Sequence, residues 1–307
     1  MSDLVALLDL GSNAARFLLV RVNPGVGYRV LQEERVQTRL GAGSPGRLPP
    51  PAVKATLRAA HSFLERVTNG RRPRVLAVAT EAVRIADNRD GLLGPLRRRE
   101  GVEVHVLSGR EEGRLGALAA LKSLPIRNGL VVDLGGGSLQ LTRIARGRIG
   151  PGASLPLGAI RLTGRFLRGD PPSTREVRAL RREVRHQLDQ AGPSGRPGDQ
   201  LVGLGGTVRT LARIHLATTR SPRKSRHGLE LGQSDVTAIR ARIEPLSCTR
   251  RRRVPGLKPE RADVILAGAL AIEELMLFGG YFTLTVCTRG VRDGLLLCET
   301  LRRRVQR

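Results

Sequence analysis

Aromatic side chains are scarce in this chain, which has no tryptophan, two tyrosines and five phenylalanines among 307 residues. None of them alternates with arginine in the way that stacks on single-stranded nucleic acid. Helix-turn-helix, zinc-finger and RNA-binding motifs are also missing from the sequence. Although the formal net charge is +26, a specific nucleic-acid partner is therefore not expected.

Cysteine and long apolar runs are equally rare. The three cysteines, Cys248, Cys287 and Cys298, are an odd number at unpatterned spacing, which favours reduced thiols over a disulfide framework. Asp3 interrupts the N-terminus where a signal peptide needs apolar residues, and the best candidate span, 264–278, is short and contains two glutamates. We expect this span to be a buried helix, and the protein to be cytoplasmic with no membrane segment.

Acidic residues are also few relative to basic ones, since the chain has 27 Asp and Glu but 53 Lys and Arg. A net charge of this size attracts polyanions and speeds their arrival, and salt weakens the attraction. A bias toward arginine accounts for part of the excess, since only four of the basic residues are lysine. In the predicted helix 174–190 the arginines lie largely off the apolar stripe, and a solvated basic face is the simplest interpretation.

The two halves of the chain contain similar segments. Residues 5–13 and 130–138 each have an apolar run, then Asp-Leu-Gly, then small polar residues, and a second β-prone run follows each segment. Each segment predicts a β-hairpin with an aspartate and a glycine-rich turn at its tip. The repetition predicts a pseudo-two-fold pair of α/β domains with a cleft where the two hairpin tips face each other.

Three glycine-rich turns are candidate phosphate-binding loops, because glycine lets backbone N–H groups converge on an anion without side-chain obstruction. Two of them are the hairpin tips, and the third precedes a helix, whose N-terminal field also favours phosphate. A single glycine turn is usually only a turn, but three of them, two in matching context, favour a phosphate site. The candidate residues are Gly11, Ser12 and Asn13, then Gly135, Gly136, Gly137 and Ser138, and finally Gly205, Gly206 and Thr207.

Carboxylates near these turns complete the candidate site. Asp9 and Asp133 end equivalent strands, where each is able to hold Mg²⁺ directly or through water. Ser108 and Glu111 have the spacing of a capping box, which gives Glu111 a structural role. Glu112 has no such local role and is a candidate for the group that accepts a proton from attacking water.

One basic residue joins this set. Arg84 ends the run Ala-Thr-Glu-Ala-Val-Arg after an apolar strand, and its guanidinium is suited to pair with a phosphate.

Seven segments carry a resemblance to a known family. They are Asp9–Asn13, Ala79–Arg84, Leu107–Leu115, Val132–Ser138, Gly203–Thr207, Arg261–Gly268 and Gly290–Leu296. In this order they resemble the exopolyphosphatase / guanosine pentaphosphate phosphatase (Ppx/GppA) family of the actin–hexokinase–chaperone ATPase superfamily. The resemblance implies an α/β fold of two actin-like (ribonuclease H-like) domains with a cleft between them, spanning residues 1–121 and 122–307. The last helix, at about residues 293–305, is a candidate to pack back on the first domain.

The resemblance also implies roles for single residues. It makes Glu112 the general base, places Asp133 in a site for Mg²⁺ and water, and assigns phosphates to Arg84 and the glycine loops. Asp9 is a second metal candidate because of its equivalent strand end, and Mn²⁺ is the alternative ion. The expected reaction is Mg²⁺-dependent release of terminal orthophosphate from inorganic polyphosphate. Hydrolysis of guanosine pentaphosphate to the tetraphosphate is the closest alternative. A homodimer is a candidate assembly, which the sequence does not fix.

The chain departs from the family pattern beside the second loop. The family usually has Gly-Gly-Gly-Ser-Thr-Glu-Leu, whereas this chain has Leu139 and Gln140 after Ser138. Gln140 replaces a carboxylate with a catalytic or metal-binding role, and a neutral amide is a weaker Mg²⁺ ligand. A weakly active or non-catalytic protein that binds polyphosphate or an alarmone is therefore a further alternative. A sugar or acetate kinase of the same superfamily is disfavoured, because Glu111-Glu112 fits the hydrolase family.

Overall fold

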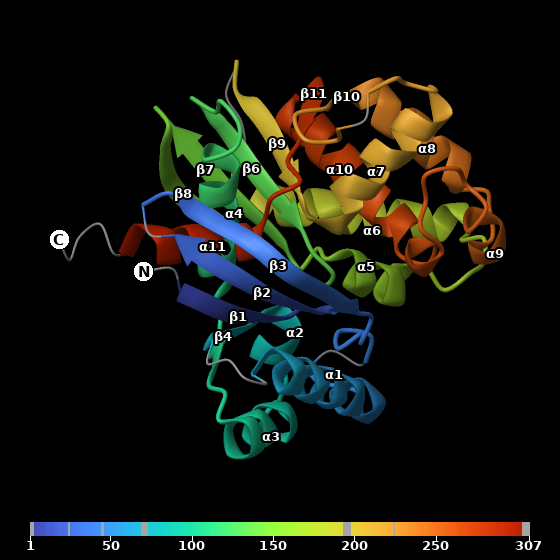
Figure 1. Ribbon diagram of the computed structural model, residues 1–307. Coiled ribbons are helices and arrows are strands. Elements are labelled where there is room, and N and C mark those ends of the chain that lie inside the picture. The colour runs from blue at the N-terminus through green and yellow to red at the C-terminus, as the bar shows by residue number, and fades with distance from the viewer. Residues whose placement is uncertain are drawn as a thin grey trace. The chain divides into compact units, whose positions relative to one another are not determined.

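The computed structural model describes residues 3–23, 25–43, 46–68, 73–192, 198–223 and 225–302. The chain divides into two compact units. Unit 1 is Met1–Leu115 with Val291–Arg307, and unit 2 is Gly116–Gly290. Each unit has one β-sheet with helices packed on it, so the predicted α/β class is confirmed (Figure 1). The division falls inside helix α4 (Gly109–Leu121), whose last residue is the predicted domain boundary.

The described residues of unit 1 form a five-stranded sheet in the order β3-β2-β1-β4-β5. The first three strands make antiparallel hairpins, and β4 and β5 run parallel to β1. The strands are β1 (Asp3–Leu10), β2 (Ala15–Asn23), β3 (Gly27–Val36), β4 (Arg74–Ala79) and β5 (Val104–Val106). The helices are α1 (Pro50–Thr68), α2 (Glu81–Arg84), α3 (Asp90–Glu100) and α11 (Val291–Arg302).

Strand β1 separates its side chains by alternation, as a strand with both faces covered must. Its even-numbered residues from 6 to 10 pack into the core that α1, α2 and α3 cover. Val5 and Leu7 point to the other face, where they pack with Leu296 of α11. Asp9 has the same parity as Val5 and Leu7 and therefore lies on the α11 face of the sheet.

The described residues of unit 2 form a six-stranded sheet in the order β10-β11-β9-β6-β7-β8. Helix α10 packs against α5, α6, α7 and α8 on one face of this sheet (Figure 1). The strands are β6 (Gly129–Leu134), β7 (Leu139–Ala145), β8 (Arg148–Leu155), β9 (Gln200–Leu204), β10 (Glu230–Gly232) and β11 (Thr283–Val286). The helices are α5 (Ala159–Phe166), α6 (Thr174–Gln190), α7 (Gly205–Thr218), α8 (Gln233–Ile243), α9 (Cys248–Arg251), the 3₁₀ turn η1 (Pro259–Arg261) and α10 (Ile265–Gly279).

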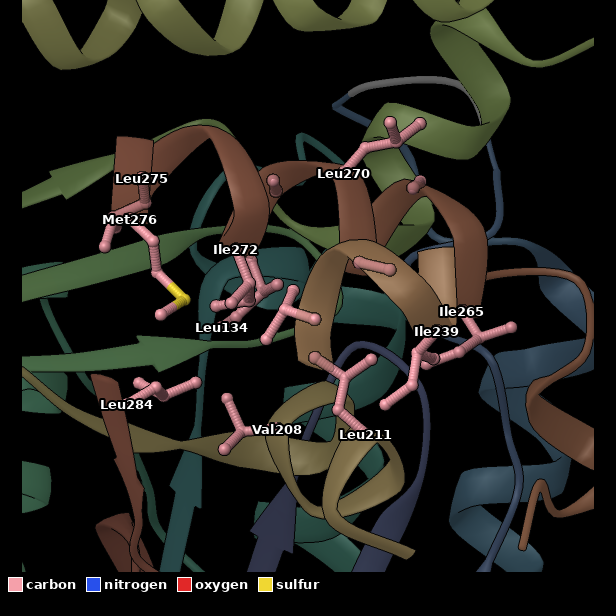
Figure 2. Packing of buried hydrophobic residues seen from close by; sticks show 14 of the residues in the cluster. Leu134, Val208, Leu211, Ile239, Ile265, Leu270, Ile272, Leu275, Met276 and Leu284 are labelled. Atoms are coloured by element: carbon pink, nitrogen blue, oxygen red, sulfur yellow. The ribbon is translucent and has the colours of Figure 1, made fainter. Parts of the chain in front are cut away.

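Helix α10 is the centre of the unit 2 core and is buried on all sides from Ile265 to Met276. Figure 2 shows its side chains converging with Leu134 of β6, Val208 of α7 and Leu284 of β11. The predicted buried helix at 264–278 is therefore confirmed from Ile265 to Met276, whereas Leu277 and Phe278 at its end are exposed. Across the described ranges, no helix is long and apolar enough to cross a membrane.

Two carboxylates lie inside this apolar helix, and both are ion-paired. Glu274, which is fully buried, accepts hydrogen bonds from Arg181 and Arg185 of α6. Glu273 accepts from Arg181 and from Arg240 of α8, whose Nε lies 3.1 Å from Oε2. The interpretation of the α6 arginines as a solvated face is therefore wrong for Arg181, because its guanidinium bridges two buried carboxylates.

Candidate functional site

The first glycine turn, residues 11–13, joins β1 to β2 and is held from outside by the segment that follows β3. The N–H of Arg39 donates to the carbonyl of Asn13 at 3.1 Å, and the N–H of Gly41 donates to that of Ser12 at 2.8 Å. A Cβ on Gly41 would lie 2.9 Å from the Cβ of Ser12, so only glycine permits this close approach. The turn therefore has a fixed backbone in which two carbonyls are already occupied.

Asp9 sits beside this turn among basic side chains. It is buried, and its Oδ2 lies 3.7 Å from Nε of Arg292 on α11. The strand register places Arg16 of β2 directly opposite Asp9, on the same face of the sheet. Sequence reasoning missed both arginines. The internal repeat contains a signal for one of them, because Arg16 follows Asp9 by the same spacing as Gln140 follows Asp133.

Glu112 and Arg84, which the sequence predicted for separate roles, form an ion pair. Glu112 lies in the first turn of α4 with 6% of its surface exposed, and its Oε1 accepts a hydrogen bond from Nη1 of Arg84. The same nitrogen donates to the carbonyl of Leu107 at 2.6 Å. Within the described part of the chain, Nε and Nη2 of Arg84 make no hydrogen bond. The guanidinium therefore fixes the carboxylate while retaining donors for a further anion.

Glu111 has the structural role that its spacing predicted. The N–H of Ser108 donates to Oε2 of Glu111 at 2.8 Å, and the N–H of Glu111 donates to Oγ of Ser108 at 3.2 Å. These bonds complete a capping box at the start of α4. The pKa of Glu111 is held below its ordinary value, chiefly by the Ser108 N–H, with smaller contributions from the Ser108 hydroxyl and His105.

In unit 2, Asp133 and Gln140 are direct cross-strand neighbours in the β6–β7 hairpin. Asp133 has the same parity as Val131, which packs with the second half of α4, so both side chains lie on that face of the sheet. Gln140 is buried, and its Nε2 donates to Oγ of Ser138 at 2.6 Å and to Oγ of Ser154 at 3.3 Å. The residue that departs from the family pattern therefore contacts the predicted phosphate loop.

The third glycine motif begins helix α7 immediately beside Asp133. Gly205 has φ +89°, and a Cβ there would lie 2.7 Å from Oδ1 of Asp133 and 2.5 Å from the carbonyl of Leu134. Thr207 is buried against Gly268 of α10. The structure thus brings the predicted metal ligand of unit 2 together with the helix N-terminus that was predicted to bind phosphate.

Arg261 is a further residue of this region that sequence reasoning did not single out. A Cβ on Gly206 would lie 1.8 Å from Nη2 of Arg261, so the guanidinium occupies the space that only a glycine leaves open. This contact places a positive charge at the N-terminus of α7, where it adds to the field of the helix. The available signal was its position at the start of the segment Arg261–Gly268.

The candidate metal ligands do not form a protein-only cage. Among the described residues, no group of three or more His, Cys, Asp or Glu side chains is placed to hold a metal ion. Mg²⁺ in phosphoryl-transfer sites usually takes only one or two carboxylates, with water and substrate phosphates as the other ligands. Asp133 in unit 2 and Asp9 in unit 1 remain the predicted ligands, and the cleft between the hairpin tips stays a prediction.

Replacing Gln140 with glutamate is expected to raise the rate about ten-fold when Mg²⁺ is saturating, the gain from one charged ligand. The two serine hydroxyls can rotate to donate to the new carboxylate, so the fold should tolerate it. Without a cation, however, the new charge faces Asp133 directly across the hairpin, which is destabilising. Titration of both the rate and the Tm against Mg²⁺ checks this expectation. Unchanged rate and unchanged Tm at every Mg²⁺ concentration would show that position 140 does not act on the metal.

Comparison with known proteins gives a consistent result. The model of the Ppx/GppA phosphatase family matches residues 18–303. Exopolyphosphatase 2 of Mycobacterium tuberculosis is 31% identical over 313 residues, covering 95% of this chain and 97% of its own. Exopolyphosphatase 1 of Mycobacterium leprae is also 31% identical, over 95% of this chain and 88% of its own. The crystal structure of the Aquifex aeolicus Ppx/GppA family member superimposes with a TM-score of 0.82 at 29% identity, covering 99% of each chain.

Proposed function

Since the chain belongs to the Ppx/GppA phosphatase family, we propose that it releases terminal orthophosphate from inorganic polyphosphate. Family membership makes it a phosphatase with an actin-like fold, and the substrate is the part that we propose. The proposed substrate is supported by the +26 charge and by relatives that are named exopolyphosphatases.

The observation that carries the proposal is the ion pair between Arg84 and Glu112. A phosphohydrolase needs a base that takes a proton from water and a cation that holds the phosphoryl oxygens. Here one guanidinium fixes the carboxylate through Nη1, and its fork has donors left to bind a phosphate oxygen. The buried position of Glu112 limits competition from bulk water for its carboxylate.

The proposed reaction is an in-line displacement. Water attacks the terminal phosphorus, Glu112 accepts the proton of that water, and the bond between phosphorus and the bridging oxygen breaks. The shortened chain leaves with the bridging oxygen as an anion. Backbone N–H groups of residues 136–138 and of the α7 N-terminus are the proposed donors for the phosphoryl oxygens.

A divalent metal fits this chemistry, and Mg²⁺ is the ion that we propose. Asp133 offers a half-buried carboxylate beside the α7 N-terminus, and Asp9 offers a buried carboxylate beside the first glycine turn. When bound, Mg²⁺ neutralises charge on the phosphate oxygens and orients water.

The test is to measure phosphate release from three substrates side by side. Long-chain polyphosphate is expected to give the highest kcat/KM, with tripolyphosphate and guanosine pentaphosphate lower. Faster release from guanosine pentaphosphate would assign the chain to the alarmone reaction instead. Binding of all three substrates without any release would identify a non-catalytic binding protein and would overturn the proposal.

Binding of long-chain polyphosphate is expected to weaken steeply as salt concentration rises, because each phosphate contact with an arginine releases a counterion. Tripolyphosphate touches fewer basic residues, so its affinity should depend less on salt. Affinities measured by calorimetry at several salt concentrations give the two slopes. Equal slopes would count against an extended basic surface and would leave the net charge as compositional bias.

A further inference from the structure

The backbone of the second glycine loop is held by the start of helix α5. The N–H groups of Gly158, Ala159 and Ile160 donate to the carbonyls of Gly137, Gly135 and Gly136 at 3.1, 3.0 and 2.8 Å. All three loop carbonyls are therefore turned toward α5. The first N–H groups of this helix have no partner within the helix and donate to the loop instead, in contrast to α7, whose N-terminus is a candidate phosphate site.

This arrangement orients the loop amides. A peptide bond is planar and trans, so a carbonyl and the N–H of the following residue point in opposite directions. Because the carbonyls of residues 135–137 face α5, the N–H groups of residues 136–138 face away from it. Successive backbone N–H groups on one side of a glycine loop make a concave anion-binding surface. The contact with α5 thus decides which side of the loop receives a phosphate.

The fit between loop and helix is tight at one position. A Cβ on Gly158 would lie 2.1 Å from the carbonyl carbon of Gly137 and 2.3 Å from the carbonyl oxygen of Gly136. Any other residue at position 158 would push the loop away from the helix. The loop and α5 therefore form one rigid element.

One side chain reinforces the same contact. Nε of Arg161 donates to the carbonyl of Gly137 at 3.1 Å, so this oxygen accepts both a backbone N–H and a guanidinium. A hydrogen bond from a charged donor is stronger than a neutral one, and it polarises the peptide that accepts it. The polarised peptide links Gly137 to Ser138, and its N–H becomes a better donor to an anion.

We propose that Arg161 is a positioning residue of the phosphate loop, which orients and polarises the Gly137–Ser138 peptide through the Nε hydrogen bond. The inference rests on the proposed function, because it assumes that the loop binds a phosphate of the substrate. It assigns Arg161 an effect on phosphate affinity through the backbone, separate from any attraction by its charge.

Three substitutions separate the hydrogen bond from the charge. Arg161→Gln keeps an N–H donor at the same distance along the side chain as Nε but removes the charge. Arg161→Lys keeps the charge but has a methylene at that point. Arg161→Met removes both. Arg165→Met is the matched control, because Arg165 lies one turn further along α5, is exposed, and pairs with Glu183 instead of the loop.

The readout is the affinity for tripolyphosphate, measured by calorimetry, together with KM and kcat. Arg161→Met and Arg161→Lys are expected to bind about ten-fold more weakly, in line with the loss of one charge-assisted hydrogen bond. Arg161→Gln should bind within about three-fold of the wild type, since a neutral hydrogen bond retains part of that energy. Arg165→Met should bind as the wild type does.

Two results would overturn the inference. One is full affinity in Arg161→Lys with weak binding in Arg161→Gln, which would mean that only the charge matters. The other is equal affinity of all four variants and the wild type. If Arg161→Met does not fold, hydrogen exchange at residues 136–138 in the Gln and Lys variants gives the same distinction. A wild type that neither binds tripolyphosphate nor releases phosphate would instead refute the proposed function.

Discussion

Replacing Glu112 with glutamine is expected to lower kcat by a factor of about 10² to 10⁴, the usual contribution of general base catalysis. The amide oxygen of glutamine can still accept the hydrogen bond from Arg84, so the local structure should persist. It cannot take a proton from water. Substrate affinity should therefore stay within a few-fold of the wild type, because the lost interaction belongs to the transition state.

The neighbouring residue provides the control. Glu111→Gln keeps an oxygen that can accept from the Ser108 N–H but removes the negative charge, so it is expected to lower the free energy of unfolding by about 0.5 kcal/mol, the low end of the range for a cap, while leaving kcat unchanged. Steady-state kinetics and urea unfolding on both variants check the pair. If the two variants exchanged phenotypes, the assignment of Glu112 as the base would be wrong.

The capping box also predicts how the stability difference between the wild type and Glu111→Gln changes with pH. The folded-state pKa of Glu111 is lowered from 4.5, so its contribution to stability is present above that value. The contribution is lost as the pH falls through the lowered pKa. The difference in stability between the wild type and Glu111→Gln should therefore shrink in acid.

The second large effect concerns the ion pairs between Glu274 of α10 and two arginines of α6. Glu274→Ala is expected to lower the free energy of unfolding by about 3 kcal/mol, at the lower end of the range for breaking a buried pair. The lower end applies because the Arg181 side chain keeps Glu273 as a partner and Arg185 is largely exposed already. A loss of this size is a large fraction of the total stability of a domain.

The basic side chains around Glu273 stabilise its ionised carboxylate even though it is buried. Burial acts to raise the pKa of Glu273, but hydrogen bonds from Arg240 and Thr237 and the charge of Arg181 outweigh it and leave the pKa lowered. Glu244→Ala is the matched control, because Glu244 pairs with Arg240 at the helix surface and should contribute about 0.5 kcal/mol or less. Denaturant midpoints for the two variants make the comparison. Equal destabilisation by both would show that burial adds nothing to the Glu274 pairs.

The sequence by itself determined the features that depend on local pattern. Side chains alternate between the two faces of a strand. This alternation fixes the face on which Asp9 lies in the first hairpin and Asp133 in the second. The capping box of Glu111 is equally local, since its partner Ser108 lies three residues away. The buried helix α10 was readable because fifteen consecutive residues are almost entirely apolar.

Only the tertiary structure decided which distant residues meet. Arg84 reaches Glu112 across 28 residues, and Arg181 reaches Glu274 across 93, because a strand order or a helix packing brings them together. No spacing rule along the chain predicts such contacts, since the period of a helix or strand is lost in the loops between elements.

The glycine loop shows the same division within one motif. Its glycines were visible in the sequence and predicted a backbone that accepts an anion, but they did not indicate which way the peptides face. That direction comes from α5, which begins more than twenty residues later and donates to the loop carbonyls. A glycine backbone has many allowed conformations, so its orientation is set by the contacts that tertiary packing supplies.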